Sequence, residues 1–130
     1  MPFIHLVVAR PLAPEVKREL GRRATTLVVD ILGKRREVTA ALVETAEAGA
    51  WSIGGEAVAG SAAHCAVFIT AGSNGADEKA ALIAAMHELL RATLADLAEA
   101  SYAVIHEIAA DDWGYGGRTQ AARRVAQAAR

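Results

Sequence analysis

Short apolar runs alternate along this chain with longer segments in which apolar residues recur at helical spacing. The runs predict strands and the spaced segments predict helices, in the order strand, helix, strand, and this order occurs twice. Residues 3–9 and 65–71 are mostly apolar runs, stopped by Arg10-Pro11 in the first case and by a glycine-rich tetrapeptide in the second. Runs of this length and composition are typical of buried strands. The second strand of each set is predicted at residues 39–45 and 102–108.

A helix is predicted between the two strands of each set. Helical spacing of apolar residues covers residues 14–32 and 76–94, with Pro14 in a first turn that tolerates proline and Gly33 as the stop. The positions that carry the spacing are Val16, Leu20, Leu27, Val28 and Ile31 in the first helix, and Leu82, Ile83, Met86, Leu89 and Leu90 in the second. A short last helix is predicted at residues 119–130.

The recurrence is a sequence repeat. A shift that places Trp51-Ser52-Ile53-Gly54-Gly55 on Trp113-Gly114-Tyr115-Gly116-Gly117 also aligns, without a gap, the pairs Lys17 and Lys79, Leu20 and Leu82, Leu27 and Leu89, and Leu32 and Leu94. Such a repeat sets the unit of the fold. We therefore expect one domain over residues 1–130, with a first βαβ unit at 2–56, a second at 64–118, and a C-terminal tail helix at 119–130.

The order of elements predicts the architecture. In each βαβ unit a right-handed crossover makes the two strands parallel. Two units side by side give an α/β (α+β) fold, in which a four-stranded mixed sheet carries two helices on one face. The other face of that sheet has no layer to cover it, which predicts a homo-oligomer, and a closed ring of three chains would bury it.

Composition and charge narrow the function classes. The chain has 130 residues, of which 53% are hydrophobic and 5% aromatic, so its core is built from aliphatic side chains. A net charge of −1 argues against a nucleic-acid partner. The single cysteine, Cys65, is interpreted as a small buried hydrophobe. There is neither an apolar run of spanning length nor an export signal, so we expect no membrane partner and a cytoplasmic protein.

The residues that carry chemistry resemble those of a known family. Pro2 directly after the initiator methionine, the Glu15-Val16-Lys17 helix start and the Trp51–Glu56 segment (Trp-Ser-Ile-Gly-Gly-Glu) are similar to those of the tautomerase superfamily, whose type is 4-oxalocrotonate tautomerase. The doubling resembles the two-unit, fused members. This resemblance implies a tautomerase/MIF-like fold, a homotrimer, and keto–enol proton transfer on a small unsaturated or enolic keto acid, with no cofactor and no metal.

Pro2 can serve such a reaction only through a free ring nitrogen. Met1 is commonly removed when proline follows it, and the proline nitrogen then becomes a secondary amine. An α-amine titrates near pH 8, and burial favours its neutral form. A neutral amine at an apolar strand end can take a proton from a carbon beside a carbonyl and return it elsewhere. Pro2 is therefore the predicted catalytic residue.

The resemblance identifies the substrate-binding residues less directly than it identifies Pro2. The resemblance aligns Trp51 with the aromatic residue that forms a wall of the site in the type enzyme. It aligns Leu12 and Ala40 with the two arginines that bind substrate there, so both charges are missing. The counterparts of these two in the second unit are Asn74 and Tyr102. The small-molecule substrate therefore needs other groups to hold it.

Four further side chains are candidates for that task. Arg10 would reach back toward Pro2 if its strand continued. Tyr102 could donate a hydrogen bond to a developing enolate. Trp113 would form a wall opposite Pro2, and Arg118 could bind a carboxylate. The Lys34-Arg35-Arg36 run is interpreted as a cluster that complements the dipole at a helix C-terminus.

Two alternatives remain open. One is a small-acid dehalogenase, decarboxylase or hydratase of the same superfamily, and the other is a non-catalytic oligomeric member. His64, which aligns with Pro2 in the repeat, is internal, so the second unit offers no free amine of its own.

Overall fold

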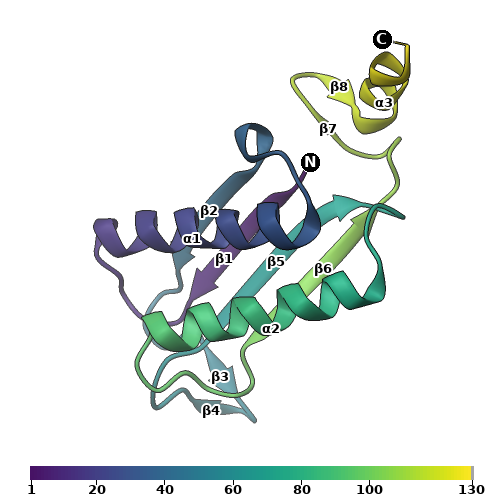
Figure 1. Cartoon of the computed structure of the whole chain (residues 1–130). Helices are drawn as coiled ribbons and strands as arrows, with labels where there is room; N and C mark the ends of the chain where they lie inside the picture. The colour runs from purple at the N-terminus through teal and green to yellow at the C-terminus, as the bar shows by residue number, and fades with distance from the viewer. Residues whose placement is uncertain (130) are drawn as a thin grey trace.

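A four-stranded mixed sheet in the order β2-β1-β5-β6 forms the centre of the molecule, which a computed structural model describes over residues 1–129 (Figure 1). Its strands are β1 (Phe3–Val8), β2 (Ala40–Thr45), β5 (Ala63–Thr70) and β6 (Tyr102–Ile108). β1 is parallel to β2 and β5 is parallel to β6, whereas β1 and β5 are antiparallel. The predicted fold class is confirmed.

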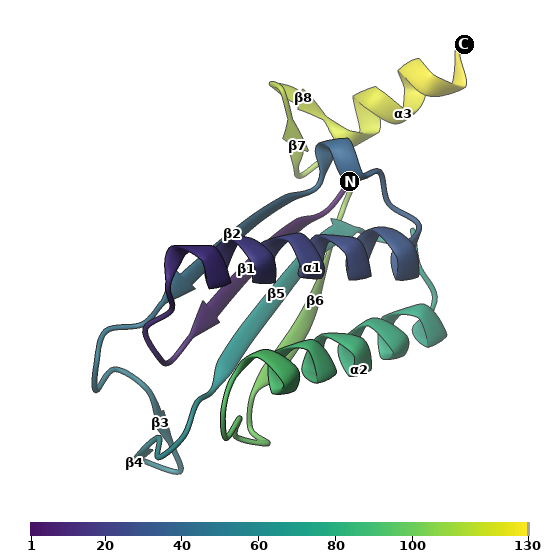
Figure 2. The same ribbon diagram turned by 60° about the vertical axis from the view of Figure 1, so that its left-hand side comes forward.

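Two long helices, α1 (Pro14–Leu32) and α2 (Ala76–Thr93), lie together on one face of the sheet (Figure 2). Pro14 occupies the first turn of α1, as predicted. Gly33 ends α1 in the left-handed region at φ 69°, where a side chain would be strained. At the start of α2 the Glu78 carboxylate accepts the Gly75 backbone N–H at 3.0 Å.

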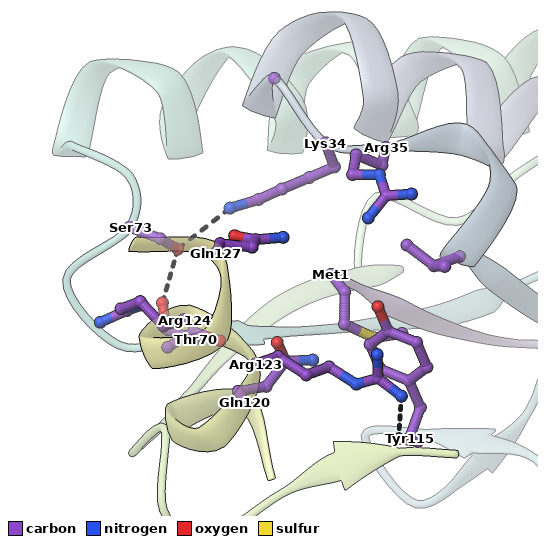
Figure 3. A pocket seen from close by; sticks show the side chains of 12 residues that line it. Met1, Lys34, Arg35, Thr70, Ser73, Tyr115, Gln120, Arg123, Arg124 and Gln127 are labelled. Carbon is purple, nitrogen blue, oxygen red and sulfur yellow. Dashed lines mark hydrogen bonds between the residues drawn. The ribbon is translucent and has the colours of Figure 1, made fainter. Parts of the chain in front are cut away.

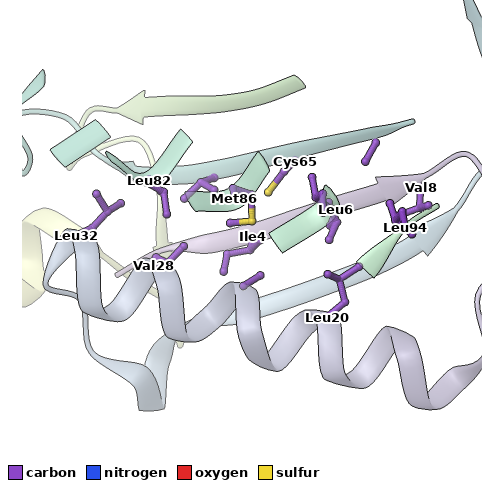
Figure 4. Close-up of a cluster of buried hydrophobic side chains, with 14 of the residues drawn as sticks. Ile4, Leu6, Val8, Leu20, Val28, Leu32, Cys65, Leu82, Met86 and Leu94 are labelled. Atoms are coloured by element: carbon purple, nitrogen blue, oxygen red, sulfur yellow. The ribbon is translucent and has the colours of Figure 1, made fainter. Parts of the chain in front are cut away.

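The core lies between the helices and the sheet. Every second residue of β1, namely Ile4, Leu6 and Val8, is fully buried. These side chains pack against buried residues of both helices and of β5, among them Leu20, Val28, Leu32, Val67, Ile69, Leu82, Met86 and Leu90 (Figure 4). Cys65 belongs to this cluster, and its burial raises the pKa of its thiol to about 12, so its interpretation as a small buried hydrophobe is confirmed.

Each unit ends in a short hairpin, where the repeat had indicated only a glycine turn. β3 (Ser52–Ile53) pairs with β4 (Glu56–Ala57), and β7 (Gly114–Tyr115) pairs with β8 (Arg118–Thr119). The two hairpins lie at opposite ends of the sheet (Figures 1 and 2). A one-turn helix, η1 (Arg36–Val38), precedes β2 and was not predicted.

The tail helix α3 (Gln120–Ala128) follows β8 and lies near the amino terminus (Figure 2). The Thr119 hydroxyl caps it by accepting the Ala122 backbone N–H at 3.0 Å. Arg130, the predicted last residue of this helix, lies outside the described residues. None of the helices described combines the length and the apolar composition that crossing a bilayer requires.

The face of the sheet that α1 and α2 leave uncovered is rich in aromatic and imidazole rings. Phe68 stacks between Phe3 and His106, with ring centroids 5.9 Å and 4.5 Å away. His5 bonds to the Glu44 carboxylate at 2.5 Å on the same face. A face of this kind resembles an interface more than a water-exposed surface.

Candidate functional site

A cavity of about 250 Å³ lies at the amino end of β1 (Figure 3). Because β1 and β5 are antiparallel, with Phe3 opposite Phe68, the start of β1 meets the end of β5. The loop after α1, the turn after β5, the β7–β8 hairpin and α3 converge there. The lining residues are Met1, Gly33, Lys34, Arg35, Val38, Thr70, Ser73, Tyr115, Gln120, Arg123, Arg124 and Gln127.

The amino terminus of the chain lies at this cavity. Met1 is one of its walls, and the Pro2 side chain directly behind it is fully buried. The Pro2 nitrogen is therefore one peptide bond away from a residue that lines the cavity. Removal of Met1 would leave that nitrogen as the terminal group at the cavity wall.

The walls are cationic. Lys34, Arg35, Arg123 and Arg124 line the cavity, and no Asp or Glu does so within residues 1–129. Burial lowers the pKa of the terminal amine on Met1, and Lys34, Arg124 and Arg35 lower it further. The cavity thus favours a neutral amine and attracts anions.

Lys34 is fixed in place by the end of α1 and by the second unit. Its backbone N–H donates to the Val29 carbonyl at 3.1 Å, just past the Gly33 cap. Its Nζ donates to the Ser73 hydroxyl at 3.0 Å, and Ser73 in turn donates to the Thr70 carbonyl at 2.6 Å (Figure 3). Burial lowers the pKa of the Lys34 ammonium, and Arg124 adds to this effect while Glu78 opposes it.

The opposite wall comes from the second hairpin and α3. Arg123 donates through Nη2 to the Tyr115 carbonyl at 2.9 Å, and its guanidinium lies 3.8 Å from the centroid of the Tyr115 ring. Gln120 Nε2 and Arg123 Nε are buried and have no hydrogen-bond partner among residues 1–129. Leaving a buried donor unpaired costs about 1–3 kcal/mol, so these two atoms are an unusual feature of the site.

Two of the predicted site residues lie at this end of the sheet, beside the cavity and outside its lining. Trp113 donates through Nε1 to the Thr70 hydroxyl at 3.2 Å. Asn74 donates to the Leu32 carbonyl at 2.9 Å and to the Glu78 carboxylate at 3.2 Å. Both polar groups thus have structural partners.

Three others lie at the opposite end of the sheet. Arg10 donates to the carbonyls of Gly60 and Ala59, each at 2.6 Å, and shares a smaller cavity of about 170 Å³ with Trp51. The expectation that Arg10 reaches back toward Pro2 of its own chain is wrong, because β1 ends at Val8. A strand of this length carries the chain about 20 Å away from its start.

Tyr102 is the third of these, whereas Arg118 lies on the hairpin at the Pro2 end of the sheet, outside the cavity lining. Tyr102 pairs with His64, which pairs with Val7 near the far end of β1, and Tyr102 is 65% exposed. Arg118 is exposed on β8, in a separate depression with Asp111 and Asp112.

Sequence reasoning missed most of the residues that line the cavity. The sequence analysis interprets the Lys34-Arg35-Arg36 run only as a cluster that complements the dipole at the end of the first helix, whereas Lys34 and Arg35 line the cavity. Arg123 and Arg124 stood only in a predicted tail helix. The available signal was two pairs of adjacent basic residues, Lys34-Arg35 and Arg123-Arg124, but nothing in the sequence indicated that they meet.

Comparisons with known proteins agree with one another. The family model described as "Tautomerase enzyme" matches residues 2–60. A probable tautomerase, K2 of Dickeya dadantii (strain 3937), is 36% identical over 59 residues, which are 45% of this chain and 88% of that protein.

Solved structures match over nearly the whole chain. The wild-type fused 4-OT named F6, an asymmetric trimer, is 26% identical, with a TM-score of 0.81 over 93% of this chain and 98% of that one. A macrophage migration inhibitory factor-like protein from Entamoeba histolytica is 20% identical, with a TM-score of 0.78 over 91% and 97%. At 20% identity, the likeness to the Entamoeba histolytica protein shows the fold alone.

Proposed function

The chain belongs to the tautomerase superfamily, in its two-unit form, and on that basis we propose that it transfers a proton between the enol and keto forms of a small unsaturated or enolic keto acid. The Pro2 nitrogen is the base and the acid of this reaction, once Met1 has been removed. The observation that supports this most is the position of Met1, which lines a cationic cavity while the Pro2 ring behind it is buried.

The proposed reaction moves one proton between two atoms of the substrate and needs only the Pro2 amine to carry it. The neutral Pro2 nitrogen takes a proton from the enol oxygen, or from a carbon beside the carbonyl, and becomes a secondary ammonium. It then returns a proton to another carbon of the same delocalised system, and the amine is neutral again. Burial and the positive charges of Lys34, Arg124 and Arg35 lower the pKa of the terminal amine on Met1. We expect the same surroundings to favour the neutral form of the Pro2 amine and to stabilise the negative charge on the intermediate.

The experiment compares three forms of the protein in the ketonisation of phenylenolpyruvate. These are the form whose intact mass shows loss of Met1, the same sequence purified with Met1 retained, and Pro2→Ala. We expect the Met1-retaining form to lose at least about 100-fold in kcat/KM, because its Pro2 nitrogen is an amide. Equal rates with and without Met1 would remove Pro2 from the mechanism.

The Met1-retaining form is a matched control, because it differs from the processed form by one residue at the site. Pro2→Ala keeps a terminal amine but changes it from secondary to primary. We expect it to lose at least tenfold in kcat/KM, with a melting temperature close to that of the wild type.

We also expect a homotrimer. The uncovered face of the sheet, with Phe3, Phe68 and His106 stacked on it, has no covering layer among residues 1–129 of its own chain, and the fused 4-OT named F6 was solved as a trimer. In a trimer, Arg10, Trp51 and Tyr102 could serve Pro2 of a neighbouring copy. Sedimentation equilibrium checks this, and a monomer at micromolar concentration would contradict it.

A further inference from the structure

We propose that Ser73 is a positioning residue of the Pro2 site. Its hydroxyl holds the Lys34 ammonium at the wall of the cavity, so that the second βαβ unit fixes a charge that acts on the terminal amine of the first. The link to catalysis rests on the proposed function, but the state of the amine can be measured without any substrate. Ser73 acts through Lys34 and is not itself a catalytic residue.

The Ser73 hydroxyl is oriented to accept a hydrogen bond from Lys34. A hydroxyl has one proton to donate and two lone pairs that accept. Ser73 Oγ donates to the Thr70 carbonyl at 2.6 Å and accepts from Lys34 Nζ at 3.0 Å (Figure 3). Thr70 is itself fixed, because its own hydroxyl accepts the Trp113 Nε1–H at 3.2 Å. The acceptor for Lys34 is therefore held by the end of β5 and by the chain that follows β6.

The partner of Lys34 is a neutral group, so the charge of the ammonium is not cancelled by it. Burial lowers the pKa of the Lys34 ammonium, and the Glu78 carboxylate on α2 raises it, which makes Glu78 the competing partner. That carboxylate accepts from the Gly75 backbone N–H at 3.0 Å and from the Asn74 amide at 3.2 Å. Without the Ser73 hydroxyl we expect the flexible Lys34 stem to turn toward Glu78 or solvent, where its charge acts less on the amine.

Lys34 is one of several charged and titratable groups that surround the terminal amine. The loop after α1 contributes Lys34 and Arg35 to the lining, β7 contributes Tyr115, and α3 contributes Arg123 and Arg124, with no Asp or Glu among the lining residues described. Burial lowers the pKa of the Met1 amine most, and Lys34 comes next, ahead of the other cations. The position of Lys34 is therefore the one that we expect to matter most for the Pro2 amine.

The two ends of the sheet differ at this pair of positions. The shift that aligns the two units places Pro11 opposite Ser73 and Asp96 opposite Lys34. Proline has no hydroxyl and aspartate carries the opposite charge, so the same contact cannot form at the other end. The second unit, whose His64 offers no free amine, instead supplies the hydroxyl that supports the site of the first.

The experiment titrates the Pro2 nitrogen of the Met1-free protein by nitrogen NMR after isotope labelling of proline. It compares Ser73→Thr with Ser73→Val, because these two side chains have the same shape and only the first keeps a hydroxyl. Ser73→Ala is the simple deletion. Thr93→Ala is the control for loss of a hydroxyl, since Thr93 donates to the Leu89 carbonyl within α2 and lies outside the cavity lining.

We expect Ser73→Val and Ser73→Ala to raise the pKa of the Pro2 amine by at least about 0.3, because a nearby positive charge that disfavours the ammonium form has moved away. Ser73→Thr and Thr93→Ala should titrate like the wild type. The acid limb of kcat/KM for phenylenolpyruvate should move to higher pH by the same amount. If Ser73→Val titrates like Ser73→Thr, the proposal is wrong.

A double-mutant cycle tests whether Ser73 acts through Lys34. In the Lys34→Met background, Ser73→Val should leave the titration of the Pro2 amine unchanged, because the ammonium that the hydroxyl holds is gone. A shift of the same size in that background would overturn the positioning role. A lower melting temperature without any shift of the titration in either background would also overturn it, since a structural role alone predicts that result.

The NMR titration also separates this proposal from the proposed function. If the Met1-retaining form is as active as the processed one, proton transfer by Pro2 fails, and the titration still decides what Ser73 does to the amine. If the titration is insensitive to Ser73 while activity requires the free Pro2 nitrogen, the positioning role is wrong and the proposed function stands.

Discussion

The guanidinium of Arg123 lies 3.8 Å from the centroid of the Tyr115 ring and is also bonded to the Tyr115 backbone carbonyl, which joins α3 to the second hairpin. The ring and not the hydroxyl makes the stacking contact. We therefore expect Tyr115→Phe to keep kcat/KM for phenylenolpyruvate within about twofold, and Tyr115→Leu to lower it and to destabilise the protein by about 0.5–2 kcal/mol. Urea unfolding and initial rates check this. A Tyr115→Phe variant as impaired as Tyr115→Leu would instead give the hydroxyl a chemical role.

The pH dependence of activity should report the charge around the terminal amine. Burial lowers the pKa of the terminal amine on Met1, and the cations Lys34, Arg124 and Arg35 lower it further. We expect the same surroundings to act on the Pro2 amine once Met1 is removed. Since the neutral amine is the active base, kcat/KM should rise with pH through a midpoint below the ordinary α-amine value, about 7.7–8.0.

Removing one of these cations tests the sign of this effect. Lys34→Met keeps the apolar stem and deletes the charge, so the protonated amine is less disfavoured and its pKa rises. The acid limb of kcat/KM should move to higher pH, while Arg36→Met, outside the cavity lining, should leave it in place. A limb that stays where it is or moves to lower pH in Lys34→Met contradicts the electrostatic argument.

The second hairpin depends on Gly114. A Cβ at this position would lie 1.9 Å from the Arg118 carbonyl oxygen, so Gly114→Ala must push β7 and β8 apart. We expect a loss of more than about 1 kcal/mol in the free energy of unfolding, together with lower activity, because Tyr115 belongs to this hairpin and α3 follows it.

Gly21→Ala is the matched control for that variant. Gly21 lies inside α1, where a Cβ would meet the Val43 side chain at an ordinary 3.5 Å. Alanine there should stabilise the protein by about 0.4–1 kcal/mol, because it restricts the unfolded chain. Thermal and urea unfolding of both variants distinguish a general effect of replacing glycine from the clash at Gly114.

The repeat predicts matched energetic roles in the core. Leu20 and Leu82 align in the repeat, and each is 1% exposed in the same helix-to-sheet interface. Each change to alanine should cost about 2–5 kcal/mol in the free energy of unfolding. Val125→Ala, at a side chain that is 69% exposed, should change it by no more than about 0.5 kcal/mol. A small effect at Leu82 with a large one at Leu20 would show that the two units are not equivalent in packing.

The apolar pattern determined the helices, the four strands of the central sheet and their order, but not η1 or the two short hairpins. It predicted α1 at its observed limits and β6 likewise, and the Gly33 stop was evident because only a residue without Cβ adopts that cap at little cost. The repeat gave the mixed sheet with both helices on one face. These features follow from local periodicity, which a sequence carries in full.

Which side chains meet was decided by the tertiary structure. The sequence pointed to Pro2, but it also pointed to Arg10, which the end of β1 carries to the far side of the sheet. Lys34 and Arg123 line one cavity, although they are 89 positions apart in the sequence. They meet because β1 and β5 pair antiparallel, which brings the second hairpin over the start of the chain. The repeat predicts a mixed sheet, but that β1 and β5 are the strands that pair at its centre is a long-range contact, which no local pattern of apolar and polar residues specifies.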